Sequence, residues 1–466
     1  MHQPGSILLV SCYELGHQPF AIASPAAFLK RAGYSPNLLD LAVSDFDETQ
    51  VALADFVGIS VPMHTALRLG VRAAKRIRTI NPNCHICFYG LYASLNSKFL
   101  LEQLADSVIG GEFEGPLVEL IKVISNDRPS CVRNFEIDGV SLSGRIRAPY
   151  LQRLAFTAPS YEGLPPVEQY AQLAHDGTHR PAGYVEASRG CLHRCLHCPI
   201  PPIYDGRFFV VPQAVVLESI RDLVESGATH ITFGDPDFLN GPGHSLRLVR
   251  AMHQEFPQLT FDFTAKVEHL LKHRSLLPEF AQAGCLFVIS AFESLSDDVL
   301  KNLNKGHSRE DIHAVLEVFR NVGITLRPTW MPFTPWTTLD DYIDLLEFVR
   351  REHLIQNIDP VQYSIRLLVP PGSMLLQHDD MTAFLGPLDQ TNFAYRWTHP
   401  DPRMDELQEN VTRTVEQAID SKEGTAEIFE GVRGLAYAAR GERAIPFLPD
   451  FVPLLEPPRL TESWFC

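Results

Sequence analysis

The chain has 466 residues, 45% of them hydrophobic, and a formal net charge of −16. At about 150 residues per domain this length predicts two to three domains, and the composition excludes a disordered or collagen-like chain. The acidic balance without a basic block disfavours nucleic acid as a partner. Because no apolar run reaches the roughly 18 residues of a membrane span and the N-terminus lacks a signal-peptide core, we expect a cytoplasmic protein without a membrane partner.

Strand-like and helical patterns alternate over the first 120 residues. Short aliphatic runs predict strands at 7–10, 37–41, 56–61 and 85–89, and helical spacing predicts helices at 25–32 and 66–79. This alternation indicates a parallel, doubly wound sheet. Ligands of such sheets bind beyond the carboxyl ends of the strands, which places residues 90–94 and the glycine-rich turn 110–115 at the candidate site. Such turns also occur without a ligand.

A second βα pattern follows a proline-containing segment. Residues 121–182 are predicted to form a linker, and strands are expected at 184–188, 230–234, 260–264, 285–292, 325–331 and 362–368, with helices at 214–226, 245–255, 270–283, 309–322 and 339–351. Six strands favour a partial (β/α)6 barrel with its chemistry at the carboxyl ends of the strands. The sequence therefore predicts an α/β protein with a Rossmann-like domain (1–120), a linker (121–182), a barrel (183–375) and a mixed C-terminal extension (376–466) that includes a helix at 406–420.

Three of the nine cysteines form one cluster, Cys191-x-x-x-Cys195-x-x-Cys198, directly after the first barrel strand. A structural zinc ion normally takes four ligands from two separated pairs, whereas a [4Fe-4S] cluster held by three thiolates leaves one iron open to another ligand. The spacing favours the cluster, and zinc completed by His193 or His197 is the alternative. Five other cysteines are dispersed and expected to be structural: Cys12, Cys84, Cys87, Cys131 and Cys285.

The cysteine loop after the first strand of a half-open βα barrel resembles the radical S-adenosylmethionine (SAM) superfamily. The resemblance implies an enzyme in which Cys191, Cys195 and Cys198 hold the cluster, and the open iron chelates the amine and carboxylate of SAM. It further implies cleavage of SAM to methionine and a 5′-deoxyadenosyl radical, which abstracts hydrogen from an unidentified small-molecule or peptide substrate. The electron would come from an external donor of the flavodoxin or ferredoxin type.

Further segments of the barrel match the same superfamily. Gly234-Asp235-Pro236-Asp237 occupies the place of a Gly-Gly-Glu-like segment that meets the SAM amine, with Asp235 in place of the usual glycine or glutamate. The segment from Glu293 to Gly306 resembles an E-S-x5-L-x4-K-G pattern of the branch with an N-terminal cobalamin-binding domain. Pro332 departs from the glycine-rich turn expected after the fifth strand.

Charged residues at strand ends extend the candidate SAM site. Lys266, Glu293 and Arg366 follow or lie in the third, fourth and sixth predicted strands. A charge inside a barrel is costly unless it is paired or bound to a ligand. Two interpretations stay open, a salt-bridge network among these three residues, or Glu293 and a basic partner holding the ribose or carboxylate of SAM. The expected cofactor-binding residues are thus Gly234, Asp235, Pro236, Glu293, Lys266 and Arg366.

The N-terminal half resembles the cobalamin-binding domain of B12-type radical SAM proteins. The matching segments are 55–61, 81–82, 89–93 and 110–115. The chain lacks the D-x-H-x-x-G segment that supplies an axial histidine, and Leu91-Tyr92 replaces a small or polar pair. The resemblance makes cobalamin a candidate cofactor, and methyl or alkyl transfer the expected outcome if it binds.

The end of the chain resembles a subgroup of radical SAM proteins with a Cys-Cys-Ala-Glu-Pro or Cys-selenocysteine-Ala-Glu-Pro tail (CCAEP or CUAEP). Cys466 stands where that tail would begin, which implies continuation through a UGA codon read as selenocysteine; an accidental last residue is the alternative. For the whole protein, the alternatives to a radical SAM enzyme are a non-catalytic iron–sulfur or electron-transfer protein and a zinc-binding structural protein.

Overall fold

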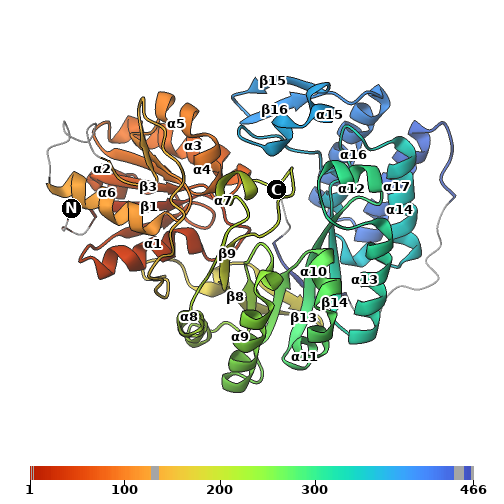
Figure 1. Cartoon of the computed structure of the whole chain (residues 1–466), viewed down its shortest axis with the longest axis horizontal. Coiled ribbons are helices and arrows are strands. Elements are labelled where there is room, and N and C mark those ends of the chain that lie inside the picture. The colour runs from red at the N-terminus through yellow and green to blue at the C-terminus, as the bar shows by residue number, and fades with distance from the viewer. Residues whose placement is uncertain (2, 4, 127–135, 446–455, 463–466) are drawn as a thin grey trace.

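A computed structural model describes the chain except for residues 2, 4, 127–135, 446–455 and 463–466. Figure 1 shows two α/β units side by side, the first in red and orange and the second mainly in green and blue. The predicted α/β fold is confirmed. Cys131 and Cys466 lie outside the described residues, so the roles expected for them stay predictions.

The first unit is built on a six-stranded sheet with the order β2-β1-β3-β4-β5-β6. The first five strands are parallel and β6 is antiparallel to β5. The strands are β1 (Ile7–Ser11), β2 (Asn37–Asp40), β3 (Phe56–Ser60), β4 (His85–Tyr89), β5 (Ser107–Ile109) and β6 (Val140–Leu142). The four predicted strands are confirmed, and β5 and β6 complete the sheet.

Helices cover both faces of this sheet because alternate side chains of its strands enter two separate cores. Leu8, Val10 and Val57 pack on the side of α3, whereas Ile7 and Leu9 pack on the side of α1 and α6. The helices are α1 (Phe20–Arg31), α2 (Glu48–Leu53), α3 (His64–Ile80), α4 (Leu91–Leu95), α5 (Ser97–Gln103) and α6 (Glu114–Asn126). Residues 90–94, expected at a ligand site, lie at the start of a helix that begins directly after Gly90.

The segment 121–182, predicted as a linker, carries regular structure where it is described. It contains the end of α6, strand β6 and strand β7 (Gln172–His175), which pairs antiparallel with β8 (Thr178–Val185). Strand β8 begins at Thr178, earlier than the strand expected from residue 184. The segment thus contributes one strand to the first sheet and a hairpin to the second.

The second unit is a half-open barrel built on a seven-stranded sheet with the order β14-β13-β12-β11-β8-β7-β17. Five strands are parallel: β8, β11 (His230–Phe233), β12 (Thr260–Thr264), β13 (Cys285–Glu293) and β14 (Thr325–Trp330). The outer helices are α8 (Gln213–Glu225), α9 (Pro242–Glu255), α10 (Val267–Lys272), α11 (Leu277–Gln282), α12 (Asp297–Asn302), α13 (Arg309–Val322) and α14 (Leu339–Arg351). Large aromatic side chains such as Phe233, Phe261 and Phe263 form the main core against these helices.

The sixth barrel strand, expected at 362–368, is not formed as a strand. A 3-10 helix, η6 (Pro360–Ser364), takes its first part, because Pro360 starts a helical turn that the side chain of Asp359 caps. Beyond it, one parallel bridge joins Phe333 and Arg366. The backbone N–H of Trp330 donates to the side-chain oxygen of Gln362, not to a strand carbonyl.

The C-terminal extension returns to both units. It contains the hairpin β15 (Leu385–Asp389) and β16 (Ala394–Trp397), the helices α16 (Pro402–Asp420) and α17 (Thr425–Ala439), and the short strand β17 (Arg459–Leu460). The predicted helix 406–420 is confirmed as part of α16. Strand β17 pairs antiparallel with β7, and Leu460 packs against Leu173, Phe287 and Ile289. The chain therefore comes back to the inner side of the half-open barrel.

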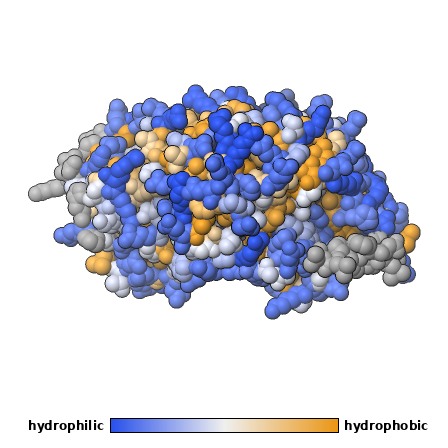
Figure 2. Space-filling view, turned by 90° about the horizontal axis from the view of Figure 1, so that it is seen from below, coloured by the Kyte–Doolittle hydropathy of each residue, from blue (hydrophilic) through white to orange (hydrophobic). Residues whose placement is uncertain are grey.

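The surface seen from below in Figure 2 is mainly hydrophilic, with hydrophobic residues gathered toward its middle. Among the helices in the described ranges, none is both long and apolar enough to cross a membrane.

Candidate functional site

The cysteine loop lies at the carboxyl end of β8, where strand β9 (Ser188–Gly190) pairs antiparallel with β10 (Phe208–Val210). Gly190 has a φ of 76°, and a Cβ atom there would lie 2.4 Å from the carbonyl oxygen of Arg207, so only glycine allows this turn. The loop leads into the short helix α7 (Pro201–Tyr204). The turn at Gly190 thus directs the cysteine loop toward the mouth of the barrel.

All three cysteines line one cavity of about 300 Å³ at this mouth. Cys191 and Cys195 are buried, Cys198 is partly buried, and all three thiols are free. Burial raises the pKa of Cys191, and that of Cys198 to about 12. Metal binding requires thiolates, so a group bound here would have to displace the thiol protons. Three sulfur ligands from one loop fit a [4Fe-4S] cluster with one open iron.

The other described cysteines lie elsewhere. Cys12, Cys84, Cys87 and Cys285 are buried in the cores of the two units. Their predicted structural role is confirmed by this packing.

Asp235, at the end of β11, lines the cavity, but its carboxylate is engaged within the protein. The backbone N–H of Ala187 donates to Oδ2 at 2.9 Å, and the Ser188 hydroxyl donates to Oδ1. Burial raises the pKa of Asp235 to about 7. Through these hydrogen bonds Asp235 links the end of β11 to the segment that leads into the cysteine loop. The sequence did not predict this role.

Glu293 is the last residue of β13, and its backbone lies in the left-handed conformation, with a φ of 65°. Its side chain belongs to a buried cluster of charged groups. Its carboxylate lies 3.1 Å from the ammonium of Lys305 and 3.2 Å from Nε2 of His197. Burial raises the pKa of Glu293, but the charges of Lys305 and His197 outweigh it and hold the pKa well below its usual range. The cluster keeps an ionised carboxylate at the cavity wall beside the cysteine loop.

The salt-bridge network among Lys266, Glu293 and Arg366, one of the two open interpretations, does not form, because each of these residues pairs with another partner. Lys266 lies at the cavity, where its ammonium is 3.6 Å from Glu268. Arg366 lies in a separate groove, pairs with Asp405 at 2.7 Å and stacks on Trp397. The expected placement of Arg366 in the SAM site is therefore also wrong, because the missing sixth strand leaves its side chain with the C-terminal extension.

Gly234 and Pro236 both line the cavity as expected. A Cβ atom on Gly234 would lie 1.9 Å from the ring of Tyr184, so the glycine makes room for that ring. Pro236 has no backbone N–H, and the segment therefore offers carbonyl acceptors more readily than donors.

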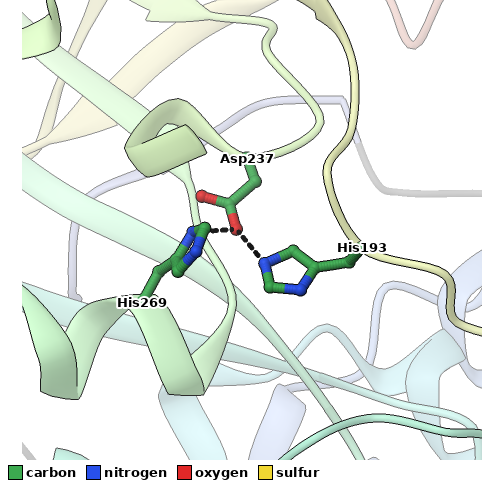
Figure 3. Close-up of side chains that lie close together, drawn as sticks. All are labelled: His193, Asp237 and His269. Atoms are coloured by element: carbon green, nitrogen blue, oxygen red, sulfur yellow. Dashed lines mark ion pairs between the residues drawn. The ribbon is translucent and has the colours of Figure 1, made fainter. Parts of the chain in front are cut away.

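The two histidines of the cysteine loop point to different partners. His197 contacts Glu293, whereas His193 turns toward Asp237 and His269 (Figure 3). Burial raises the pKa of Asp237, but the two imidazoles hold it below its usual range. The sequence motif contains Asp237 but assigns it no role. His269 could not be identified from the sequence, because it lies on α10 with no motif around it.

The N-terminal unit also reaches the cavity. Leu15 and His17, from the loop after β1, line it, and the His17 ring lies 4.6 Å from that of Tyr184 between centroids. Behind the cysteine loop, Arg189 contacts Glu112 and Glu114 of the glycine-rich turn 110–115. That turn, expected at a ligand site, thus forms the contact between the units.

The loops after β3 and β4, at the carboxyl edge of the first sheet, contact each other. Tyr92 is buried and donates its backbone N–H to the carbonyl oxygen of Val61, so the loops after β3 and β4 pack directly together. His64 contacts Tyr92 and the carbonyl oxygen of Asn392 in the β15–β16 hairpin. Tyr92 and His64 thus occupy part of this edge.

Comparison with known families defines the class of protein. The Radical SAM superfamily model matches residues 185–349, and the B12 binding domain model matches residues 7–121. The chain therefore contains a radical SAM domain and an N-terminal B12-binding domain, as its sequence predicts. A [4Fe-4S] cluster and SAM are the cofactors that this class implies, and the B12-binding domain makes cobalamin a candidate.

Solved structures share this fold. The cobalamin-dependent SAM radical enzyme OxsB, with aqua-cobalamin bound, is 17% identical with a TM-score of 0.69, over 89% of this chain and 67% of that chain. The radical SAM methyltransferase TsrM from Kitasatospora setae, with cobalamin and a [4Fe-4S] cluster bound, is 17% identical with a TM-score of 0.60, over 75% of this chain and 74% of that chain.

Curated relatives match part of the chain. The ribosomal protein uS12 methylthiotransferase RimO of Bacteroides thetaiotaomicron is 26% identical over 229 residues, 43% of this chain and 52% of the relative. The tRNA-2-methylthio-N(6)-dimethylallyladenosine synthase of Chlorobium limicola is 28% identical over 219 residues, 45% of this chain and 48% of the relative. The chain thus spans about half the length of these relatives.

Proposed function

We propose that this protein is a radical SAM enzyme in which Cys191, Cys195 and Cys198 hold a [4Fe-4S] cluster and SAM binds in the same cavity. The observation that carries the proposal is the convergence of three free thiols of one loop on a cavity at the carboxyl ends of the barrel strands. When bound, the cluster supplies the electron that cleaves SAM into methionine and a 5′-deoxyadenosyl radical. An external flavodoxin- or ferredoxin-type protein would deliver that electron.

The cavity wall offers complementary groups to the two ends of SAM. The carbonyl oxygens of the segment from Gly234 to Pro236 suit the SAM ammonium, because this segment is short of donors. The ionised carboxylate of Glu293, held by Lys305 and His197, suits the ribose hydroxyls as an acceptor. Lys266, which also lines the cavity, supplies a cation for the SAM carboxylate.

The buried ammonium of Lys305 has a second role beside the cysteine loop. Burial lowers the pKa of Lys305, but Glu293 and the sulfur of Cys195 outweigh it and raise the pKa. A cation fixed here stabilises negative charge on thiolate ligands in a site that excludes most water. Lys305 therefore supports both Glu293 and the ligand loop.

We further propose that the substrate is a small molecule or a peptide and that the outcome is methyl or alkyl transfer. The B12-binding domain and the methylthiotransferase and methyltransferase names of the relatives support group transfer. Fold and cofactor do not fix the substrate, so product analysis must identify the transferred group.

Anaerobic reconstitution with iron and sulfide, followed by SAM and a reductant, tests the proposal. We expect 5′-deoxyadenosine from the reconstituted protein, and S-adenosylhomocysteine in addition if a methyl group is transferred. The triple variant Cys191→Ala, Cys195→Ala, Cys198→Ala should lose both the iron–sulfur absorption and the products, while Cys285→Ala, a buried cysteine outside the cavity, should keep them. A cluster without SAM cleavage would instead indicate the electron-transfer alternative, and a triple variant with a full iron and sulfide content would refute the assignment.

A further inference from the structure

Three metal-ligating side chains from three different segments meet beside the cysteine loop. His193 comes from the loop itself, Asp237 follows β11 and His269 lies on α10 (Figure 3). One ligand atom from each lies within 4.8 Å of the other two. The contact distances to Oδ2 of Asp237 are 2.9 Å from Nδ1 of His269 and 3.5 Å from Nε2 of His193.

Asp237 and His269 are buried, and His193 is partly buried. Their exposed fractions are 14% for His193, 0% for Asp237 and 8% for His269. The other carboxylate oxygen of Asp237 accepts a hydrogen bond from the backbone N–H of Leu239, and Oδ2, which faces the histidines, also accepts one from the backbone N–H of Lys266 at 3.4 Å. The carboxylate is thus held in place before any ligand arrives.

The two histidine nitrogens are not satisfied by Asp237 alone. Nε2 of His193 and Nδ1 of His269 are both buried, and neither makes a hydrogen bond of acceptable geometry with a described residue. Buried polar atoms without partners are costly and rare. Two buried nitrogens without a well-formed hydrogen bond that face one carboxylate oxygen are the arrangement that a cation satisfies.

We propose that His193, Asp237 and His269 bind a divalent transition-metal ion of the Zn²⁺ type, separate from the cluster held by the cysteines. Two imidazoles and one carboxylate are a common ligand set for zinc. With metal–ligand distances of about 2.0–2.2 Å, the ligand atoms of a tetrahedral site lie roughly 3.4 Å apart. This value lies between the distances from Oδ2 of Asp237 to Nδ1 of His269, 2.9 Å, and to Nε2 of His193, 3.5 Å. The fourth position is left for water.

Glu268 completes the arrangement on the far side of His193. Its Oε2 atom lies 3.7 Å from Nδ1 of His193, the ring nitrogen that does not face Asp237. A carboxylate behind a metal-bound histidine fixes the tautomer of the ring and strengthens it as a ligand. The ion ties the cysteine loop to the ends of β11 and β12, so it holds that loop in place whether or not the cluster is present.

Zinc binding to a cluster-free form of the full chain tests this site independently of the proposed function. In the variant Cys191→Ser, Cys195→Ser, Cys198→Ser the thiolates cannot hold zinc, and calorimetric titration with Zn²⁺ should give one tight site per chain. His269→Asn should lose that site, Glu268→Gln should weaken it by about 10- to 100-fold, and His273→Asn should leave it unchanged. His273 is the matched control because its ring contacts His269 but is not one of the three ligands.

Two further readouts exclude a folding artefact. Co²⁺ added to the same cluster-free chain should give visible absorption bands of a tetrahedral N/O site, which His269→Asn removes while the far-ultraviolet circular dichroism stays unchanged. In the reconstituted wild-type protein, metal analysis should find one zinc per chain in addition to the cluster iron. Absence of zinc from both forms, or an unchanged affinity in His269→Asn, would overturn the proposal and leave a cluster of hydrogen-bonding groups only.

Discussion

The guanidinium of Arg189 lies 2.7 Å from the carboxylate of Glu114 and joins the barrel to the N-terminal unit. It also contacts Glu112 at 3.2 Å and Glu186 at 2.6 Å, and Arg189, Glu112 and Glu114 are buried. Burial raises the pKa of Glu112 to about 7 although Arg189 acts in the opposite direction. Arg189 is thus the common partner of three carboxylates, and it lies two residues before Cys191.

Replacing Arg189 by Ala should strongly destabilise the contact between the units. Removing one partner of a buried ion pair leaves an uncompensated charge and costs about 3–5 kcal/mol, and here three carboxylates lose their common partner. Thermal unfolding and limited proteolysis should both show the loss. Arg194→Ala is the control, because its pair with Asp205 is exposed, and an effect as small as that of this control would contradict the role given to Arg189.

Replacing Lys305 by Met should destabilise the protein and abolish SAM cleavage. The pKa of Glu293 would rise once the neighbouring cation is lost, because burial alone raises it. We expect a loss of about 3 kcal/mol in unfolding free energy, against less than about 0.5 kcal/mol for the exposed Lys301→Met. Equal 5′-deoxyadenosine yields from both variants would refute the role of Lys305.

Gly234→Ala should be destabilising through Tyr184. The added Cβ would lie 1.9 Å from the ring, and overpacking of this kind costs about 1–3 kcal/mol. In a double-mutant cycle with Tyr184→Leu, which removes the clashing ring atoms, most of that cost should disappear. If the cost of Gly234→Ala were the same in both backgrounds, another contact would be responsible.

His17 should make the protein less stable in acid. Burial lowers the pKa of His17 to about 4. Between about pH 6.5 and pH 4, His17 therefore binds a proton in the unfolded chain but not in the folded chain. Stability is therefore present above about pH 6.5 and falls as the pH approaches 4, by about 2 kcal/mol at pH 5. His17→Phe keeps a ring against Tyr184 without a titrating group, and its melting temperature should fall less between about pH 7.5 and pH 5. An identical fall in both proteins would show that His17 is not responsible.

Local patterns in the sequence determined the order of strands and helices, the half-open barrel and the three cluster cysteines. These features depend on periodicity and short spacing, which neighbouring residues carry by themselves. The sixth barrel strand shows the limit of such patterns: the segment is apolar enough for a strand, but Pro360 and the Asp359 cap start a helical turn instead.

Contacts between distant residues were decided only by the tertiary structure. The pairing of Glu293 with His197 and the meeting of His193, Asp237 and His269 join segments that no common motif links, and the separation of Arg366 from the cavity follows from its contact with Asp405. A charged side chain in a sequence has many potential partners, and burial selects among them because an unpaired charge is too costly to keep. The sequence therefore specified the cysteine loop, and the packing of the two units specified what surrounds it.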